Sequence, residues 1–105
     1  MDIEIRTDNN IKGDAAMVAN AKSEVEKTLG RFDSHVTSIH VHLSDGSSGH
    51  DGHDDIQCMI EARVEGRSPD AITEKGESVD QALSGAIRKM RQLLDSEIGK
   101  MQDAR

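Results

Sequence analysis

Apolar and polar residues alternate in three stretches of the chain, which is the pattern of a β-strand with one buried face. These stretches cover residues 2–7, 37–43 and 56–65. Their apolar positions predict the residues that face the core: Ile3, Ile5, Ile39, Val41, Leu43, Cys58, Ile60, Ala62 and Val64. Residues 71–73 come soon after Pro69 and predict a short fourth strand at a sheet edge, where proline is tolerated.

Two other segments repeat apolar residues every three or four positions, as amphipathic helices do. The first follows Asp14, a favourable N-cap, and is predicted to end near residue 30. The second follows Ser78, which with Gln81 matches a capping box, and keeps one apolar stripe as far as Met101. The elements therefore follow the order βαβββα.

This order predicts an α+β fold, with a four-stranded mixed sheet and two helices packed on one face. A length of 105 residues fits one domain, so we expect residues 1–105 to form a single unit. Residues 44–55 contain no aliphatic side chain and are predicted to form a flexible loop. The last few residues are expected to fray.

The charge balance limits the partners of the chain. Twenty acidic residues face thirteen basic ones, so the formal net charge is −7 and polyphosphates are repelled at long range. Any binding of nucleic acid requires a local basic patch. Phe32 is the only aromatic residue, which excludes recognition of RNA through bases stacked on aromatic side chains.

The composition also indicates a cellular compartment. Cys58 is the only cysteine, so no intramolecular disulfide can form. The acidic start of the chain lacks the basic and apolar regions of a signal peptide, and no apolar run is long enough for a membrane span. We therefore expect a cytoplasmic protein without a membrane partner.

The chain resembles the hibernation promoting factor and ribosome-associated inhibitor A family over nearly all of its length. The order and spacing of five segments carry the resemblance: residues 3–10 (IEIRTDNN), 29–32 (LGRF), 41–45 (VHLSD), 58–63 (CMIEAR) and 82–90 (ALSGAIRKM). The resemblance implies a protein that docks in the small ribosomal subunit and inhibits translation in stationary phase or under stress.

Family members use basic residues on both helices against ribosomal RNA. Carried over by position, the RNA-binding candidates are Lys27 and Lys89, with Arg88 and Arg91 as basic neighbours. One basic position of the family holds Glu24 here. The chain also stops before the dimerisation domain of the family's long form, so it is not expected to pair ribosomes by that route.

Two other interpretations of the surface stay open. The basic side of the last helix also matches an ordinary helix face that is exposed to water. The net charge of −7, together with Glu24, motivates an alternative function. In that alternative the fold is retained as a protein-interaction or stress-response module that no longer binds the ribosome. The polar side of the sheet should be lined by Arg6, His40, His42, Met59, Glu61 and Arg63, and could serve a homodimer or simply face water.

No catalytic constellation, phosphate-cradling glycine motif or cofactor motif is present, so we expect a non-enzyme without a cofactor. His50 and His53 lie among aspartates and could bind zinc or nickel, but a glycine-rich loop does not pre-organise ligands and we expect no metal site. Cys58 falls on the apolar side of its strand and is predicted to be a buried, inert thiol.

Overall fold

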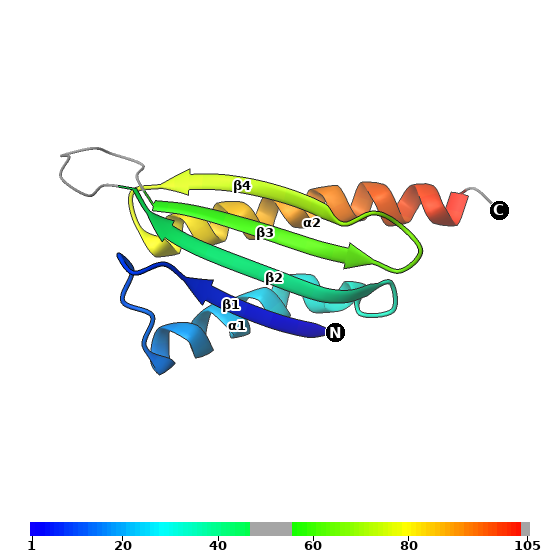
Figure 1. Ribbon diagram of the computed structural model, residues 1–105. Coiled ribbons are helices and arrows are strands. Elements are labelled where there is room, and N and C mark those ends of the chain that lie inside the picture. Colours follow the sequence, from blue (N-terminus) through cyan, green and yellow to red (C-terminus); the bar gives the residue numbers. More distant parts are fainter. Residues whose placement is uncertain (47–55, 104–105) are drawn as a thin grey trace.

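The computed structural model describes residues 1–46 and 56–103, with side chains up to residue 100 (Figure 1). Its elements are β1 (Asp2–Thr7), α1 (Ala15–Leu29), β2 (Val36–Asp45), β3 (Ile56–Val64), β4 (Asp70–Gly76) and α2 (Val79–Asp103). A 3-10 turn, Gly30–Phe32, continues α1. The predicted βαβββα order and α+β class are confirmed.

The four strands form one sheet in the order β1-β2-β3-β4, with β1 and β4 at its edges. β1 runs parallel to β2, whereas the β2–β3 and β3–β4 pairs are antiparallel, so the sheet is mixed as predicted. Both helices lie on the same face of the sheet, and the other face is open (Figure 1). Pro69 indeed precedes an edge strand.

The alternation of the strands explains this two-layer arrangement, because every second side chain leaves the sheet toward the helices. Ile39, Val41 and Leu43 of β2 are at most 1% exposed, and the apolar stripes of both helices cover them. The buried apolar residues form one cluster across the two layers. In the described part of the chain, neither helix has the length and apolarity that crossing a membrane requires.

Both helices begin at the predicted caps. The Asp14 carboxylate accepts a hydrogen bond from the Met17 amide at 2.8 Å. At the start of α2, the Ser78 hydroxyl accepts from the Gln81 amide at 3.1 Å, and the Gln81 side chain accepts from the Glu77 amide at 3.0 Å. These contacts satisfy amide groups that have no partner within the helix.

Two strands are longer than the side-chain pattern predicts. β2 continues through Ser44 and Asp45, which pair with residues 57 and 56 of β3, so the prediction of loop structure was wrong for these two residues. β4 covers Asp70–Gly76 rather than residues 71–73 alone. Backbone hydrogen bonds hold both extensions, and backbone pairing does not need apolar side chains. Residues 47–55 of the predicted loop lie outside the described residues.

A glycine brings the first turn of α2 close to β4. A Cβ atom added at Gly76 would lie 2.8 Å from the backbone nitrogen of Ala82. The absence of a side chain therefore lets the chain turn from the end of β4 directly into α2. This close connection sets which residues of β4 and α2 face each other.

Candidate nucleic-acid interface

A groove runs between α1 and α2 on the outer side of the helical layer. It has a volume of about 230 Å³, and its lining residues are Glu24, Thr28, Ser84, Ile87, Arg88 and Arg91. On each helix the lining residues are three or four positions apart, which places them on one flank. We call this feature the interhelical groove.

Arg88 and Arg91 are the basic residues of the interhelical groove. Both side chains are exposed, as the sequence predicts. Among the described residues, neither guanidinium forms an ion pair with a carboxylate. A guanidinium presents up to five N–H donors in a planar fork that matches a phosphate group, so these two groups are available to an anionic ligand.

Lys27 lies beside the same groove. It follows the lining residue Glu24 by three positions on α1, but it is not itself one of the residues that line the groove. Its side chain is exposed and meets no carboxylate within the described part of the chain. The structure therefore brings two of the four predicted RNA-binding residues, Arg88 and Arg91, into one groove, and Lys27 lies on the helix that forms the other wall of this groove.

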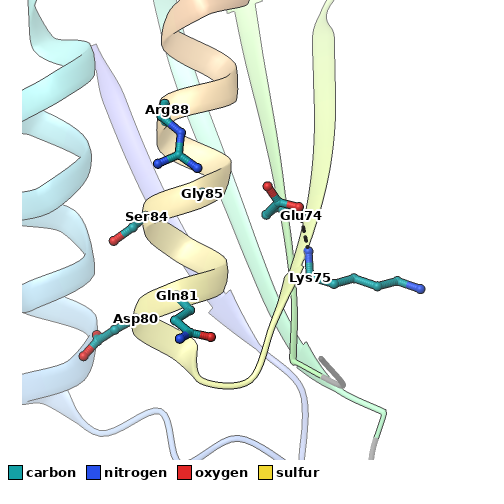
Figure 2. Close-up of a pocket in the computed structure, with 7 residues that line it drawn as sticks. All are labelled: Glu74, Lys75, Asp80, Gln81, Ser84, Gly85 and Arg88. Atoms are coloured by element: carbon teal, nitrogen blue, oxygen red, sulfur yellow. Dashed lines mark hydrogen bonds between the residues drawn. The ribbon is translucent and has the colours of Figure 1, made fainter. Parts of the chain in front are cut away.

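Lys89 lies on the flank of α2 that faces β4, whereas Arg91 lies on the flank that faces α1. Its ammonium group is 3.4 Å from a carboxylate oxygen of Glu74, on β4. Glu74 and Arg88 both line a second hollow, which lies between β4 and the first turns of α2 and has a volume of about 490 Å³ (Figure 2). The helical pattern correctly predicts that Lys89 is off the apolar stripe, but not that it faces β4.

Carboxylates also border the interhelical groove, so its potential is mixed. Glu24 is part of the lining. Beyond Arg91, Asp95 of α2 forms an ion pair with Arg31 at 2.7 Å, which bridges α2 and the end of α1. Arg31 also lies over the ring of Phe32, with its guanidinium carbon 4.9 Å from the ring centroid. Arg31 is thus held in place, unlike Arg88 and Arg91.

Sequence reasoning missed the two hydroxyl side chains of the groove, Thr28 and Ser84. Both can donate a hydrogen bond to a phosphate oxygen. Their positions contained a usable signal, because Ser84, Arg88 and Arg91 follow one another at helical spacing of four and three residues. The same spacing relates Glu24, Thr28 and Arg31 on α1.

The open face of the sheet carries the residues that the alternation predicts. Arg6, Thr7, His40, Val41, His42, Met59 and Glu61 line a shallow hollow of about 460 Å³ there. Cross-strand pairing places His40 between Glu4 and Glu61. A hydrogen bond from Arg6 lowers the pKa of the Glu4 carboxyl. The charges on this face thus neutralise one another, and its use in a homodimer stays a prediction.

Cys58 is fully buried on β3, as predicted. Burial raises the pKa of its thiol to about 12, so the reactive thiolate does not form at neutral pH. In residues 1–46 and 56–100, no three His, Cys, Asp or Glu side chains are placed to hold a metal ion. His50 and His53, for which a zinc or nickel site was considered, lie outside the described residues.

Two of the solved structures that match this chain illustrate the similarity of the fold. The N-terminal domain of protein Y from Thermus thermophilus superposes with a TM-score of 0.66 at 19% identity, covering 90% of this chain and 96% of that one. A ribosomal subunit interface protein from Coxiella burnetii gives a TM-score of 0.66 at 13% identity, covering 94% and 99%. At these identities the likeness establishes the fold. No curated protein matches the chain by sequence.

The family comparison is more direct. The family described as "Sigma 54 modulation protein / S30EA ribosomal protein" matches residues 3–102, which is nearly the whole chain. The match confirms the resemblance that the five sequence segments carry, and it covers both helices of the interhelical groove. The chain therefore belongs to the sigma 54 modulation protein / S30EA ribosomal protein family.

Proposed function

We propose that this protein is a non-enzymatic factor that binds the small ribosomal subunit and inhibits translation in stationary phase or under stress. The observation that carries the proposal is the pair of exposed arginines, Arg88 and Arg91, without carboxylate partners among the described residues. Membership in a family described as ribosomal supports the same partner. A ribosome-bound role places the protein in the cytoplasm.

Contact with ribosomal RNA would be made through phosphates. Arg88, Arg91 and Lys27 can position the protein on the RNA backbone, with Thr28 and Ser84 as additional donors. Base stacking contributes nothing, because Phe32, the only aromatic residue, is 5% exposed and lies under Arg31. Such contacts favour a site defined by the shape of folded RNA rather than by its base sequence.

The affinity should depend only moderately on salt. Neutralising about three phosphates predicts a slope near −2 to −3 in a plot of log affinity against log salt concentration. The net charge of −7 opposes the approach of a polyanion at long range, which lowers the association rate at low ionic strength. Binding is therefore expected at low and moderate salt and should be lost at high salt.

Co-sedimentation with purified small ribosomal subunits tests the proposal. The double variant Arg88→Glu/Arg91→Glu should lose binding by at least about tenfold, because two attractive contacts become repulsive. The matched control is Lys22→Glu/Arg63→Glu, which changes the net charge equally. Lys22 lies four residues before Glu26, on the flank of α1 that faces β1, and Arg63 lies on the open sheet face. Equal losses in both variants, or no co-sedimentation of the wild type at low salt, would refute the proposal.

A second candidate is a protein-interaction module that keeps the fold without binding the ribosome. The observation in its favour is that Glu24 lies in the interhelical groove and that Lys89 and Arg31 are paired with carboxylates. A pull-down that recovers a protein partner and no ribosomal proteins would support it. Strong enrichment of ribosomal proteins would exclude it. Light scattering of the purified protein would test the homodimer predicted through the open sheet face.

A further inference from the structure

Glu74 is an acidic residue of β4 that lies against α2. Its side chain leaves the strand toward Gly85, whereas that of the next residue, Lys75, extends away from the helix (Figure 2). The side chain of Glu74 is only 24% exposed, and its carboxylate accepts a hydrogen bond from the Lys75 amide at 3.2 Å. This carboxylate is therefore held in one place, although it belongs to an edge strand.

Gly85 provides the space for this carboxylate. A Cβ atom added at Gly85 would lie 2.8 Å from Cγ of Glu74 and 3.0 Å from its Oε2. These distances are below van der Waals contact, so any larger residue at position 85 would push the Glu74 side chain away. A glycine inside a helix normally costs helix stability, and here it allows a close approach between a strand and a helix.

Lys89 is the partner of the carboxylate held at Gly85. It follows Gly85 by four residues, so both positions lie on one flank of α2. The Lys89 ammonium is 3.4 Å from both carboxylate oxygens of Glu74. Lys89 is 51% exposed, so its long side chain could turn toward solvent if the carboxylate were absent.

We infer that Glu74 determines how tightly the protein binds a polyanion, because its carboxylate competes with phosphate for Lys89. The inference rests on the proposed function of the interhelical groove. Lys89 is adjacent to Arg88 in sequence and both side chains are exposed, so a released Lys89 ammonium adds one more available cation to the same turn of α2. The wild-type protein then neutralises one phosphate fewer than Arg88, Lys89 and Arg91 would neutralise together.

The expected size of the effect follows from one additional phosphate contact. Releasing Lys89 should steepen the slope of log affinity against log salt concentration by about 0.7 to 0.9. Affinity at low salt should rise about two- to fivefold, which is the range expected for one exposed ionic contact. Both quantities can be measured by titrating the full chain against purified small ribosomal subunits at several salt concentrations.

Two variants release Lys89 by different means. Glu74→Gln removes the competing charge. Gly85→Ala displaces the carboxylate without changing the net charge. A gain in affinity in this variant therefore cannot come from a change in the overall electrostatic potential of the protein. Lys89→Gln in the Glu74→Gln background should remove the gain, because no amine is then left to be released.

Each variant has a matched control. Asp80→Asn removes one negative charge from the lining of the same hollow, at a residue that has no ion pair in the described part of the chain. Gly99→Ala makes the same replacement elsewhere on α2, where an added Cβ would meet nothing within 4 Å. Neither control should steepen the salt slope. Thermal unfolding of all variants verifies that each one is folded.

The outcomes separate this inference from the proposed function. Steeper slopes for Glu74→Gln and Gly85→Ala, with no change for either control, would support it. Equal gains for Glu74→Gln and Asp80→Asn, or a gain that survives Lys89→Gln, would overturn it. If wild-type binding depends on Arg88 and Arg91 but Glu74→Gln and Gly85→Ala change nothing, the inference fails and the proposed function stands. If the wild type and every variant fail to bind at low salt, both fail.

Discussion

In the N-terminal half of α2, Arg88 and Arg91 extend into solvent beside the interhelical groove and have no carboxylate partner among the described residues. In the C-terminal half, Asp95 forms an ion pair with Arg31 at 2.7 Å, and Glu97 forms one with Arg67 at 2.6 Å. The acidic residues of the C-terminal half thus tie α2 to neighbouring segments, whereas Arg88 and Arg91 of the N-terminal half remain available. The net charge of −7 is a sum over the whole chain and does not show this difference between the two halves. Net charge is therefore a weak guide to what a particular surface binds.

The largest expected effect concerns the packing that holds both halves on the sheet. Leu94 of α2 is fully buried in the core between the helices and the sheet. Replacing Leu94 by alanine leaves a cavity and should lower the free energy of unfolding by about 2–5 kcal/mol. Urea denaturation measures this loss. Leu93, which is only partly buried, is the control, and its replacement by alanine should cost clearly less. Equal losses would show that the C-terminal half is packed differently from the structure.

The next largest effect is a pH dependence of stability, which comes from a buried thiol of the sheet and not from the charges of α2. Burial raises the pKa of the Cys58 thiol from its ordinary value of 9.0 to about 12, so the unfolded chain loses this proton first as the pH rises. The contribution of the buried thiol to the free energy of unfolding is therefore fully present below pH 9 and is lost progressively above it. The loss amounts to about 2 kcal/mol between about pH 8 and pH 10.5. Urea denaturation at both pH values measures the loss.

The control for this pH dependence is Cys58→Ala. All other groups are the same in the two proteins, so their contribution to the pH dependence cancels in the comparison. The difference in stability between the two pH values should therefore be smaller in Cys58→Ala by about 2 kcal/mol. An identical pH dependence in both proteins would contradict the buried position of the thiol.

The smallest expected effect contrasts the two halves directly. Glu97 is 18% exposed and paired with Arg67, so Glu97→Gln should lower the free energy of unfolding by up to about 1 kcal/mol. Arg88→Gln removes a charge that has no such partner and should change stability by less than about 0.5 kcal/mol. Thermal or urea unfolding of the two variants measures the contrast. A larger loss for Arg88→Gln would indicate that Arg88 is a structural residue.

The same substitution can be followed at a neighbouring carboxyl group. Burial raises the pKa of Asp70, and repulsion from Glu97 adds to this rise while Arg67 opposes it. Glu97→Gln removes the repulsion and releases Arg67, so the pKa of Asp70 should fall. An NMR titration of the Asp70 side chain measures the change, and an unchanged pKa would mean that these three groups do not interact in solution.

The residues that bind phosphate in our proposal could be found in the sequence only in part. Helical periodicity predicted that Arg88, Lys89 and Arg91 are off the apolar stripe, and all three are exposed. Periodicity could not predict that Lys89 meets Glu74, because that contact joins two elements through a glycine at position 85. Thr28 and Ser84 were missed for the same reason, since a groove belongs to two helices at once.

The strand ends show a similar limit. Side-chain alternation predicted the buried positions of β2 and β3 correctly, yet it placed the end of β2 before Ser44 and reduced β4 to three residues. Asp45 continues β2, and its amide donates to the Asp8 carboxylate at 3.2 Å. The hydrogen bonds that extend these strands form between backbone groups, which leave no trace in the order of apolar and polar residues.

The sequence by itself determined the order of elements, the α+β class, the buried faces of β2 and β3 and the family, because these depend on local periodicity and on segments that can be recognised one at a time. The predicted core residues Ile3 and Ile5 of the edge strand β1 are only partly buried. Only the tertiary structure decided which charged side chains meet. Ion pairs such as Lys89 with Glu74 and Arg31 with Asp95 join residues 15 and 64 positions apart. Their formation depends on distances of a few ångströms between packed elements, and no pattern along the chain encodes such distances.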